Sequence, residues 1–373
     1  MDPEASVLLH CAPCRGLRQS QVRVELSPRY NRCKEPELES RIASLWTDRV
    51  SQQPWLFNGA KFRLHSATLR MHRERGREGG GEGERRRGGE GQIDEGKKVE
   101  EVFKGWVEGG AGEGVSESMR QGEGEREGRR EGHREREQDR EGGGETEEDE
   151  KEGAVLTLCL GLTCYRDFLG TNWSEGARGL RARGQAQYGD PLALLAQPLG
   201  VGGVVITGDG GVVFLRRSQR VGEAAGLIDI PGGHPEPTVV VPGVGEDSVT
   251  LEQLSEEGVL KELFSSILNE IRDEVNIPLQ YLSEPLLLGI ALNHTSAGRP
   301  SAEFFIRCTL SSEKVKELYW QGGPEAHEST NIIIINREEV LQLDESSPLW
   351  PELCPSAKGA VLLYRLVQPD KEG

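Results

Sequence analysis

Residues 71 to about 153 consist almost entirely of glycine, glutamate and arginine, and this stretch limits what the rest of the chain can fold into. It contains "RERGREGGGEGERRRGGEGQ" and "GEGEREGRREGHREREQDREGGGETEEDEKEG". Such sequences bury too little apolar surface to offset an ordering entropy of roughly 1–2 kcal/mol per residue. We therefore expect a disordered insertion at 71–153, with foldable sequence on both sides of it.

The charge balance of the whole chain is acidic, with 62 Asp+Glu, 45 Lys+Arg and a formal net charge of -17 over 373 residues. A nucleic-acid backbone requires a basic face, so we expect no nucleic-acid partner. RNA binding by the Arg-Gly mixture of the insertion is a weaker alternative. The N-terminus "MDPEASVLLHCAPC" is not a signal peptide, and no run of about 18 apolar residues predicts a membrane span. We expect an intracellular protein of the cytoplasm, with the nucleus as a further compartment.

Cysteine spacing does not predict a disulfide framework. The seven cysteines are scattered along the chain: Cys11, Cys14, Cys33, Cys159, Cys164, Cys308 and Cys354. Their odd number in a long chain is unlike a small secreted protein. Cys11 and Cys14 have redox or half-zinc spacing, but no second such pair completes a zinc site. We expect free thiols.

The sequences flanking the insertion predict a helix and two strands. "ELESRIASLWTDRVSQQ" has apolar residues at helical spacing, and "PWLFNGAKFRLHSATLR" follows with an extended pattern. After the insertion, "AVLTLCLGL" predicts a strand. If these two strands pair, the insertion is a long hairpin loop, which costs only about 0.6 kcal/mol for each doubling of its length.

The remaining sequence predicts alternating strands and helices. "GGVVITGDGGVVFLRRS" is a hairpin, "GLIDIPGGHPEP" is an extended run ending in a Pro-Gly-Gly turn, and a helix is expected at about 251–276. "PLLLGIALN", "SAEFFIRCTL" and "NIIIINREEV" predict strands, whereas "SSEKVKELYWQG" and the end of "SPLWPELCPSAKGAVLLYRLV" predict helices. The order has no regular βαβ period, so it favours a mixed α/β or α+β sandwich.

The helix within 251–276 carries a cluster of acids in "KELFSSILNEIRDEVNIPL". Its apolar stripe should pack on a sheet: Phe264, Ile267, Leu268, Ile271 and Val275. Glu270 and Glu274 are four residues apart and therefore lie on one helix face, with Asp273 beside them. Stacked carboxylates are hard oxygen ligands suited to Mg²⁺. The alternative is a solvated acidic face.

"PGGHPEP" followed by a helix bearing "NEIRDEVNI" resembles the signature box of the Nudix hydrolase superfamily. Glu270 occupies the glutamate of the family's Arg-Glu pair, and Asp273 and Glu274 occupy its Glu-Glu pair. Asn276 replaces the glycine, a change compatible with a left-handed residue at a helix end. The resemblance implies a Nudix-like α/β/α sandwich with a mixed sheet and an N-terminal extension, and a divalent ion bound at a diphosphate.

Three departures separate this box from the family pattern. Asn269 replaces the usual arginine. Lys261 holds the register of the first glutamate, and Glu262 lies one place later. About twenty extra residues also separate the Pro-Gly-Gly turn from the helix. These changes leave a binding module without catalytic activity as one alternative.

Further phrases resemble a Nudix subfamily, the vertebrate UDP-glucose pyrophosphatases: "PWLFNGAKFRLHSATL", "LTCYRDFLGTNW", "HTSAGRPSAEFF", "GGPEAHEST" and "ELCPSAKGA". The resemblance implies Mg²⁺-dependent hydrolysis of UDP-glucose and UDP-galactose to UMP and sugar 1-phosphate, with Mn²⁺ as an alternative ion. A Nudix hydrolase of ADP-ribose, coenzyme A or capped RNA is the other enzymatic alternative. Composition and the resemblance together predict four regions: an N-terminal subdomain at 1–70, the insertion at 71–153, the rest of that subdomain at 154–200, and the Nudix domain at 201–370.

The resemblance implies metal binding by Glu270 and Glu274, and a contribution of Asp273 to catalysis. It implies substrate binding by eight residues: Phe57, Tyr165, Arg217, Gly222, Asp229, His234, Glu236 and Ser356. Without the resemblance, core packing is the favoured role for Phe57 and Tyr165, and helix capping is the favoured role for Ser356. Arg216 is then as good a phosphate ligand as Arg217. The candidate general bases are Glu325, His327 and Glu328. The sequence leaves the oligomeric state open.

Overall fold

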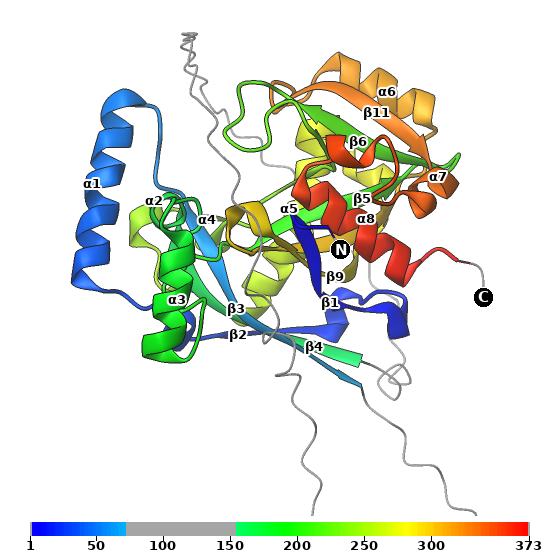
Figure 1. The fold of residues 1–373 in the computed structure, drawn as a ribbon. Coiled ribbons are helices and arrows are strands. Elements are labelled where there is room, and N and C mark those ends of the chain that lie inside the picture. Colours follow the sequence, from blue (N-terminus) through cyan, green and yellow to red (C-terminus); the bar gives the residue numbers. More distant parts are fainter. Residues whose placement is uncertain (1, 72–153, 372–373) are drawn as a thin grey trace, which may run out of the picture. The chain divides into compact units, whose positions relative to one another are not determined.

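The computed structural model describes residues 2–71 and 154–371, which belong to one unit. The disorder predicted for the insertion lies outside the described residues, except at Met71, which ends a strand. That strand, β3 (Ala60–Met71), pairs antiparallel with β4 (Ala154–Cys164) from Ala60↔Cys164 to Met71↔Ala154. The predicted pairing across the insertion is therefore confirmed (Figure 1).

The larger sheet is mixed and has the strand order β1-β9-β10-β5-β6-β11. Only the pair β10–β5 is parallel along this path. Two short strands extend it, since β7 pairs with β6 and β8 pairs with β5. The bounds of the strands are Ala5–His10 (β1), Gly200–Ile206 (β5), Gly211–Arg217 (β6), Ile228–Asp229 (β7), Gly232–Gly233 (β8), Leu286–Asn293 (β9), Arg299–Arg307 (β10) and Ser329–Asn336 (β11).

The smaller sheet has the order β2-β4-β3, with β2 (Val22–Leu26) parallel to β4. Three helices accompany it: α1 (Pro36–Gln52), α2 (Tyr165–Gly170) and α3 (Ala177–Tyr188). Arg63 of β3 is fully buried and fixes the surrounding loops, because its guanidinium donates to the carbonyl oxygens of Tyr30 at 2.7 Å, Leu192 at 2.8 Å and Leu195 at 3.1 Å.

Two long helices cover opposite faces of the larger sheet (Figure 1). α5 (Glu256–Val275) packs on one face and also on the smaller sheet, so one apolar core contains Ile267 of the helix together with Val24 and Leu156 of that sheet. α8 (Pro355–Val367) packs on the other face. The remaining helices are α4 (Pro237–Val240), α6 (Ser312–Gln321) and α7 (Arg337–Gln342). The mixed α/β class predicted from the sequence is confirmed.

The acidic helix is shorter at its start than predicted. The Ser255 hydroxyl accepts a hydrogen bond from the Gly258 amide at 3.1 Å and begins the helix, whereas Leu251–Gln253 forms a separate 3₁₀ turn. The helix ends before Asn276, which has a φ of 63° and donates its side-chain amide to the Leu318 carbonyl at 2.8 Å. This is the left-handed helix end that the sequence predicted.

All seven cysteines are free thiols in the structure. Within residues 2–71 and 154–371, no helix combines the length and the apolar content needed to cross a membrane.

Candidate functional site

The Pro-Gly-Gly turn holds the two principal carboxylates of α5. The Gly232 amide donates to Glu274 Oε2 at 3.0 Å. A Cβ atom on Gly233 would collide with the Glu270 carboxylate, and one on Gly232 would collide with the Val201 carbonyl. The glycine at 233 therefore leaves room for the Glu270 carboxylate, and the glycine at 232 allows β8 to approach β5 closely.

Both carboxyl groups are in surroundings that disfavour their negative charge. Burial raises the pKa of Glu274 well above its usual value, and Glu270 raises it further. Burial, followed by the charges of Glu325 and Glu328, raises the pKa of Glu270 to about 8. A cation placed between these groups would relieve their repulsion, so the pair fits a divalent ion electrostatically.

Asp273 differs from that pair. Both of its carboxylate oxygens accept hydrogen bonds from the neighbouring Arg272, at 2.7 and 2.6 Å. Among the described residues no group of three or more His, Cys, Asp or Glu side chains is gathered as a metal site. Two carboxylates still fit Mg²⁺, which usually keeps several waters and takes further oxygens from substrate phosphates.

Glu262 lies on the same face of α5, although it is out of register with the family pattern. It precedes Glu270 by eight residues, is 5% exposed, and accepts a hydrogen bond from the Glu236 amide at 3.1 Å. Burial raises the pKa of its carboxyl. Glu262 therefore anchors the loop that follows the Pro-Gly-Gly turn. The spacing 262, 266, 270, 274 is the sequence signal that could have predicted this shared face.

Arg217 and Asp229 form an ion pair at 3.0 Å on neighbouring strands β6 and β7. Arg217 also donates to the Glu223 carbonyl at 3.1 Å. The alternative candidate, Arg216, instead bonds Glu352 at 2.8 Å in a pair whose side chains are 34% and 50% exposed. The alternation of side chains along β6 therefore separates the two arginines, and only Arg217 pairs with another predicted site residue.

His234 and Glu236 lie in the loop directly after the turn. Burial, together with the positive charges of Arg299 and Lys61, lowers the pKa of His234 well below its usual value, so the imidazole is neutral. Glu236 contacts Lys61 of β3, with 3.5 Å between Lys61 Nζ and Glu236 Oε1. This contact joins the smaller sheet to the loop, and no sequence pattern predicted it.

Tyr165 and Gly222 line one hollow of about 580 Å³, together with Trp173, Arg41 and Arg49. Phe57 is not among its lining residues, and its side chain is 66% exposed. Ser356 lies in the first turn of α8 with its hydroxyl 3.3 Å from Cys354 Sγ. The residue that caps this helix is Cys354, so Ser356 is not the cap.

The loop that carries the candidate bases lies against the C-terminal end of α5. The Glu325 amide donates to the Asp273 carbonyl at 3.1 Å, and a Cβ atom on Gly323 would collide with that same carbonyl. Burial and the charge of Glu328 raise the pKa of Glu325. Since Glu325 and Glu328 both raise the pKa of Glu270, these two carboxylates lie near one of the two predicted metal ligands.

Glu303 of β10 is a buried carboxylate that sequence reasoning missed. It is 0% exposed, and neither side-chain oxygen has a hydrogen-bond partner among the described residues. It lies beside Gly202, whose missing Cβ leaves space for the carboxylate. Burial, followed by the charge of Asp229, raises its pKa to about 8, although Ser301 and Arg299 oppose the rise.

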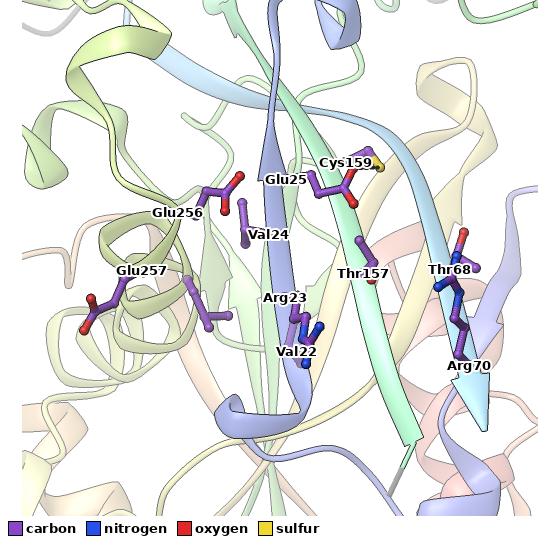
Figure 2. A pocket seen from close by; sticks show the side chains of 11 residues that line it. Val22, Arg23, Val24, Glu25, Thr68, Arg70, Thr157, Cys159, Glu256 and Glu257 are labelled. Atoms are coloured by element: carbon purple, nitrogen blue, oxygen red, sulfur yellow. Dashed lines mark hydrogen bonds between the residues drawn. The ribbon is translucent and has the colours of Figure 1, made fainter. Parts of the chain in front are cut away.

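A second hollow, of about 570 Å³, lies away from these residues (Figure 2). Arg23 and Glu25 of β2, Thr157 of β4 and Arg70 of β3 line it, beside Glu257 at the start of α5. None of the predicted site residues is among its lining side chains. It is the polar face of the smaller sheet, and we assign no catalytic role to it.

Comparison with known proteins places relatives along the whole chain. No family model matches. The "Uridine diphosphate glucose pyrophosphatase NUDT22" of Bos taurus is 45% identical over 368 residues, covering 99% of each chain. The protein of that name in Homo sapiens is 43% identical over 373 residues, covering 100% of this chain and 96% of the human one. "Nudix hydrolase 9" of Arabidopsis thaliana is 28% identical over 359 residues, covering 93% and 89%.

Proposed function

Since the chain belongs to the NUDT22 family of Nudix hydrolases, we propose that it hydrolyses the diphosphate bond of UDP-glucose and UDP-galactose to UMP and sugar 1-phosphate. The observation that carries the proposal is the seating of Glu270 and Glu274 on the two glycines of the Pro-Gly-Gly turn. This arrangement would let the buried Glu274 and the half-buried Glu270 share one ion.

Glu270 and Glu274 would hold the divalent ion that Nudix hydrolases use, and we propose Mg²⁺, with Mn²⁺ as a substitute. When bound, the ion neutralises the diphosphate and stabilises the leaving phosphate. The Gly232 amide fixes Glu274 Oε2 and so orients its carboxylate. Asp273, held by Arg272, would support the C-terminal end of α5 through its carbonyl contact with Glu325.

We assign the proton acceptor for the attacking water to Glu325 or Glu328. Both lie close enough to Glu270 to raise its pKa, whereas the side chain of His327 is exposed. Burial raises the pKa of Glu325, which makes this carboxyl a better base near neutral pH than an ordinary glutamate. Comparing kcat of Glu325→Gln and Glu328→Gln identifies the base, because only its loss should lower kcat without altering KM.

The remaining predicted residues would bind the substrate. Arg217, oriented by Asp229, would bind a phosphate oxygen, and the neutral His234 would offer one donor and one acceptor to the sugar. The hollow that contains Tyr165 and Gly222 is large enough for the uracil and ribose, and Trp173 adds a second aromatic wall. Phe57 and Ser356 would contact the substrate from outside this hollow.

UMP release from UDP-glucose and UDP-galactose, measured with Mg²⁺ and with a chelator, tests the proposal. We expect activity only with the ion. Glu270→Gln and Glu274→Gln should each lower kcat/KM at least about a hundredfold, since the ion supplies several kcal/mol of charge stabilisation. Glu257→Gln, on the exposed start of the same helix, is the matched control and should behave like wild type.

The substrate panel should include ADP-ribose, coenzyme A and capped RNA. Faster turnover of one of these would assign another Nudix activity to the same site. No turnover of any substrate, with thermal stabilisation by the ion alone, would assign a binding module instead.

A further inference from the structure

The smaller sheet contributes a cation to the acidic site. Lys61 is the second residue of β3, and its side chain is 18% exposed. Its ammonium lies 3.5 Å from Glu236 in the loop after the Pro-Gly-Gly turn. The strand that carries it pairs with β4, outside the sheet that carries the turn. Lys61 therefore reaches the site from a part of the fold that holds none of the proposed metal ligands.

The charges around Lys61 are mainly negative. Its field lowers the pKa of Glu262 and of Glu270 against the larger effect of burial, and it lowers the pKa of His234. A diphosphate entering between these carboxylates needs positive charge in addition to the ion, because like charges repel strongly where water is excluded. Lys61 supplies such a charge beside Glu236.

The Lys61 ammonium also has hydrogen-bond donors that no described residue uses. An ammonium has three donors, and the described residues give Lys61 one ion pair at the long distance of 3.5 Å. The nearby arginines are more fully used: Arg217 bonds Asp229 and the Glu223 carbonyl, and Arg299 pairs with Glu223 at 2.9 Å. Of these three cations, Lys61 has the longest ion-pair distance to a protein carboxylate.

An aromatic ring and this ammonium both lie close to Gly59. A Cβ atom on Gly59 would lie 3.2 Å from Phe57 Cε2, 3.7 Å from Lys61 Cε and 3.8 Å from Lys61 Nζ. The ring of Phe57 and the end of Lys61 therefore flank the same glycine, and the ring is 66% exposed. An apolar ring next to a point charge matches a ligand that carries a ring close to a phosphate.

We infer that Lys61 binds the diphosphate of the nucleotide-sugar substrate, and that the ring of Phe57 packs against the substrate ring next to that diphosphate. The inference rests on the proposed function and extends it, because it assigns a substrate contact to the N-terminal strand β3. Lys61 exchanges its long contact with Glu236 for phosphate oxygens when the substrate binds.

Binding of UDP and of uridine to the full chain with Mg²⁺, measured by calorimetry, tests this contact separately from turnover. Lys61→Met keeps the length of the side chain and removes its charge. It should weaken UDP binding about tenfold or more, the effect of losing a charged hydrogen bond, and leave uridine binding unchanged. KM for UDP-glucose should rise by a similar factor while kcat changes less, and Lys61→Arg should keep most of the affinity.

The matched control is Lys316→Met on α6, because Lys316 also has one ion pair, to Glu313 at 3.1 Å. A purely structural role for Lys61 is tested in the Glu236→Gln background. If Lys61 only holds Glu236, adding Lys61→Met to that variant should cause no further loss of UDP affinity. We expect a further loss of about tenfold.

The outcomes separate the two proposals. If wild type releases UMP and Lys61→Met binds UDP normally, the Lys61 contact is wrong and the proposed function stands. If wild type releases no UMP but Lys61→Met selectively weakens UDP binding, the contact stands and the hydrolase proposal fails. Wild type that binds no UDP overturns the Lys61 contact, and UMP release from UDP-glucose then decides the hydrolase proposal by itself.

Discussion

A proton and a metal ion would compete for the same carboxylate oxygens of Glu270. Its pKa is raised to about 8 by burial and by the neighbouring acids, so below that pH the ion-free protein holds a proton there. Binding of a divalent ion must release that proton.

We therefore expect the apparent Mg²⁺ affinity to rise between pH 6 and 8, by up to about tenfold per pH unit for the proton that leaves Glu270. Calorimetric Mg²⁺ titrations at pH 6, 7, 8 and 9 measure this. The slope should be shallower in Glu270→Gln, where only Glu274 remains to titrate. An affinity that does not change between pH 6 and 8 would contradict the placement of the ion at Glu270.

Glu303 has a comparable pKa, again chiefly because of burial, with the charge of Asp229 as a further cause. Its folded-state pKa of about 8 lies above the unfolded value of 4.5, so folding favours the protonated form. The stability associated with that form is fully present below pH 4.5 and is lost as the pH rises toward 8.

Replacing Glu303 by Gln should remove this dependence. We expect the free energy of unfolding of wild type to fall, relative to Glu303→Gln, by up to about 1.4 kcal/mol per pH unit between pH 5 and 8. Urea unfolding of both proteins across this range provides the comparison. Parallel pH profiles would show that Glu303 ionises normally in the folded protein.

Sequence spacing was sufficient to place Glu270 and Glu274 on one helix face, because that face depends only on helix periodicity. It was insufficient for Glu303, since "SAEFFIR" does not reveal that α8 covers the glutamate's side of the sheet. It was also insufficient for Lys61, whose contact with Glu236 joins residues 175 positions apart. The roles of all these residues stay predictions.

The residue after helix α5, Asn276, has a backbone conformation that it only partly favours. Asn276 has a φ of 63°, where a Cβ atom costs roughly 1–2 kcal/mol, and its side chain compensates through the bond to Leu318. The family pattern places glycine at this position.

We expect Asn276→Ala to lower the free energy of unfolding by about 1–3 kcal/mol, because it keeps the strain and loses the bond. Asn276→Gly loses the bond but relieves the strain, so it should cost less. Urea unfolding of the two variants separates these contributions. A larger loss for Gly than for Ala would show that relief of backbone strain does not govern stability at this position.

Elements with strong local patterns were predictable, including β3, β4, α5 and α8. Several others, among them α3 and β1, were not predicted. The sequence of α3 has little apolar content, and its buried residues are only Leu180 and Gly184. β1 is six residues long, and its place in the larger sheet depends on pairing with β9, far along the chain. Both elements are determined by tertiary contacts, which no local window contains.

The whole chain is joined across the insertion by a strand pair. Met71 and Ala154 are register partners, so the ends of the intervening sequence are neighbours. A two-residue Asn-Gly turn can connect such partners. The division of the described residues into subdomains at 70, 154 and 200 stays a prediction.

Replacing residues 72–153 by Asn-Gly should leave the melting temperature within a few degrees of wild type and kcat/KM for UDP-glucose within about twofold, since β3 and β4 keep their register. Differential scanning calorimetry and the UMP assay measure both quantities. A tenfold loss of activity at an unchanged melting temperature would instead assign a catalytic contribution to the deleted segment.

The length of β3 has a practical consequence. Lys61 lies at one end of the strand and Met71 at the other, which at about 3.4 Å per residue is a separation of roughly 34 Å. A fluorophore or a surface linker attached at Met71 would therefore be rigidly connected to the enzyme and too far from Lys61 to obstruct the proposed diphosphate contact. The strand makes the junction at Met71 a suitable attachment point for immobilising the protein or for single-molecule measurements of substrate binding.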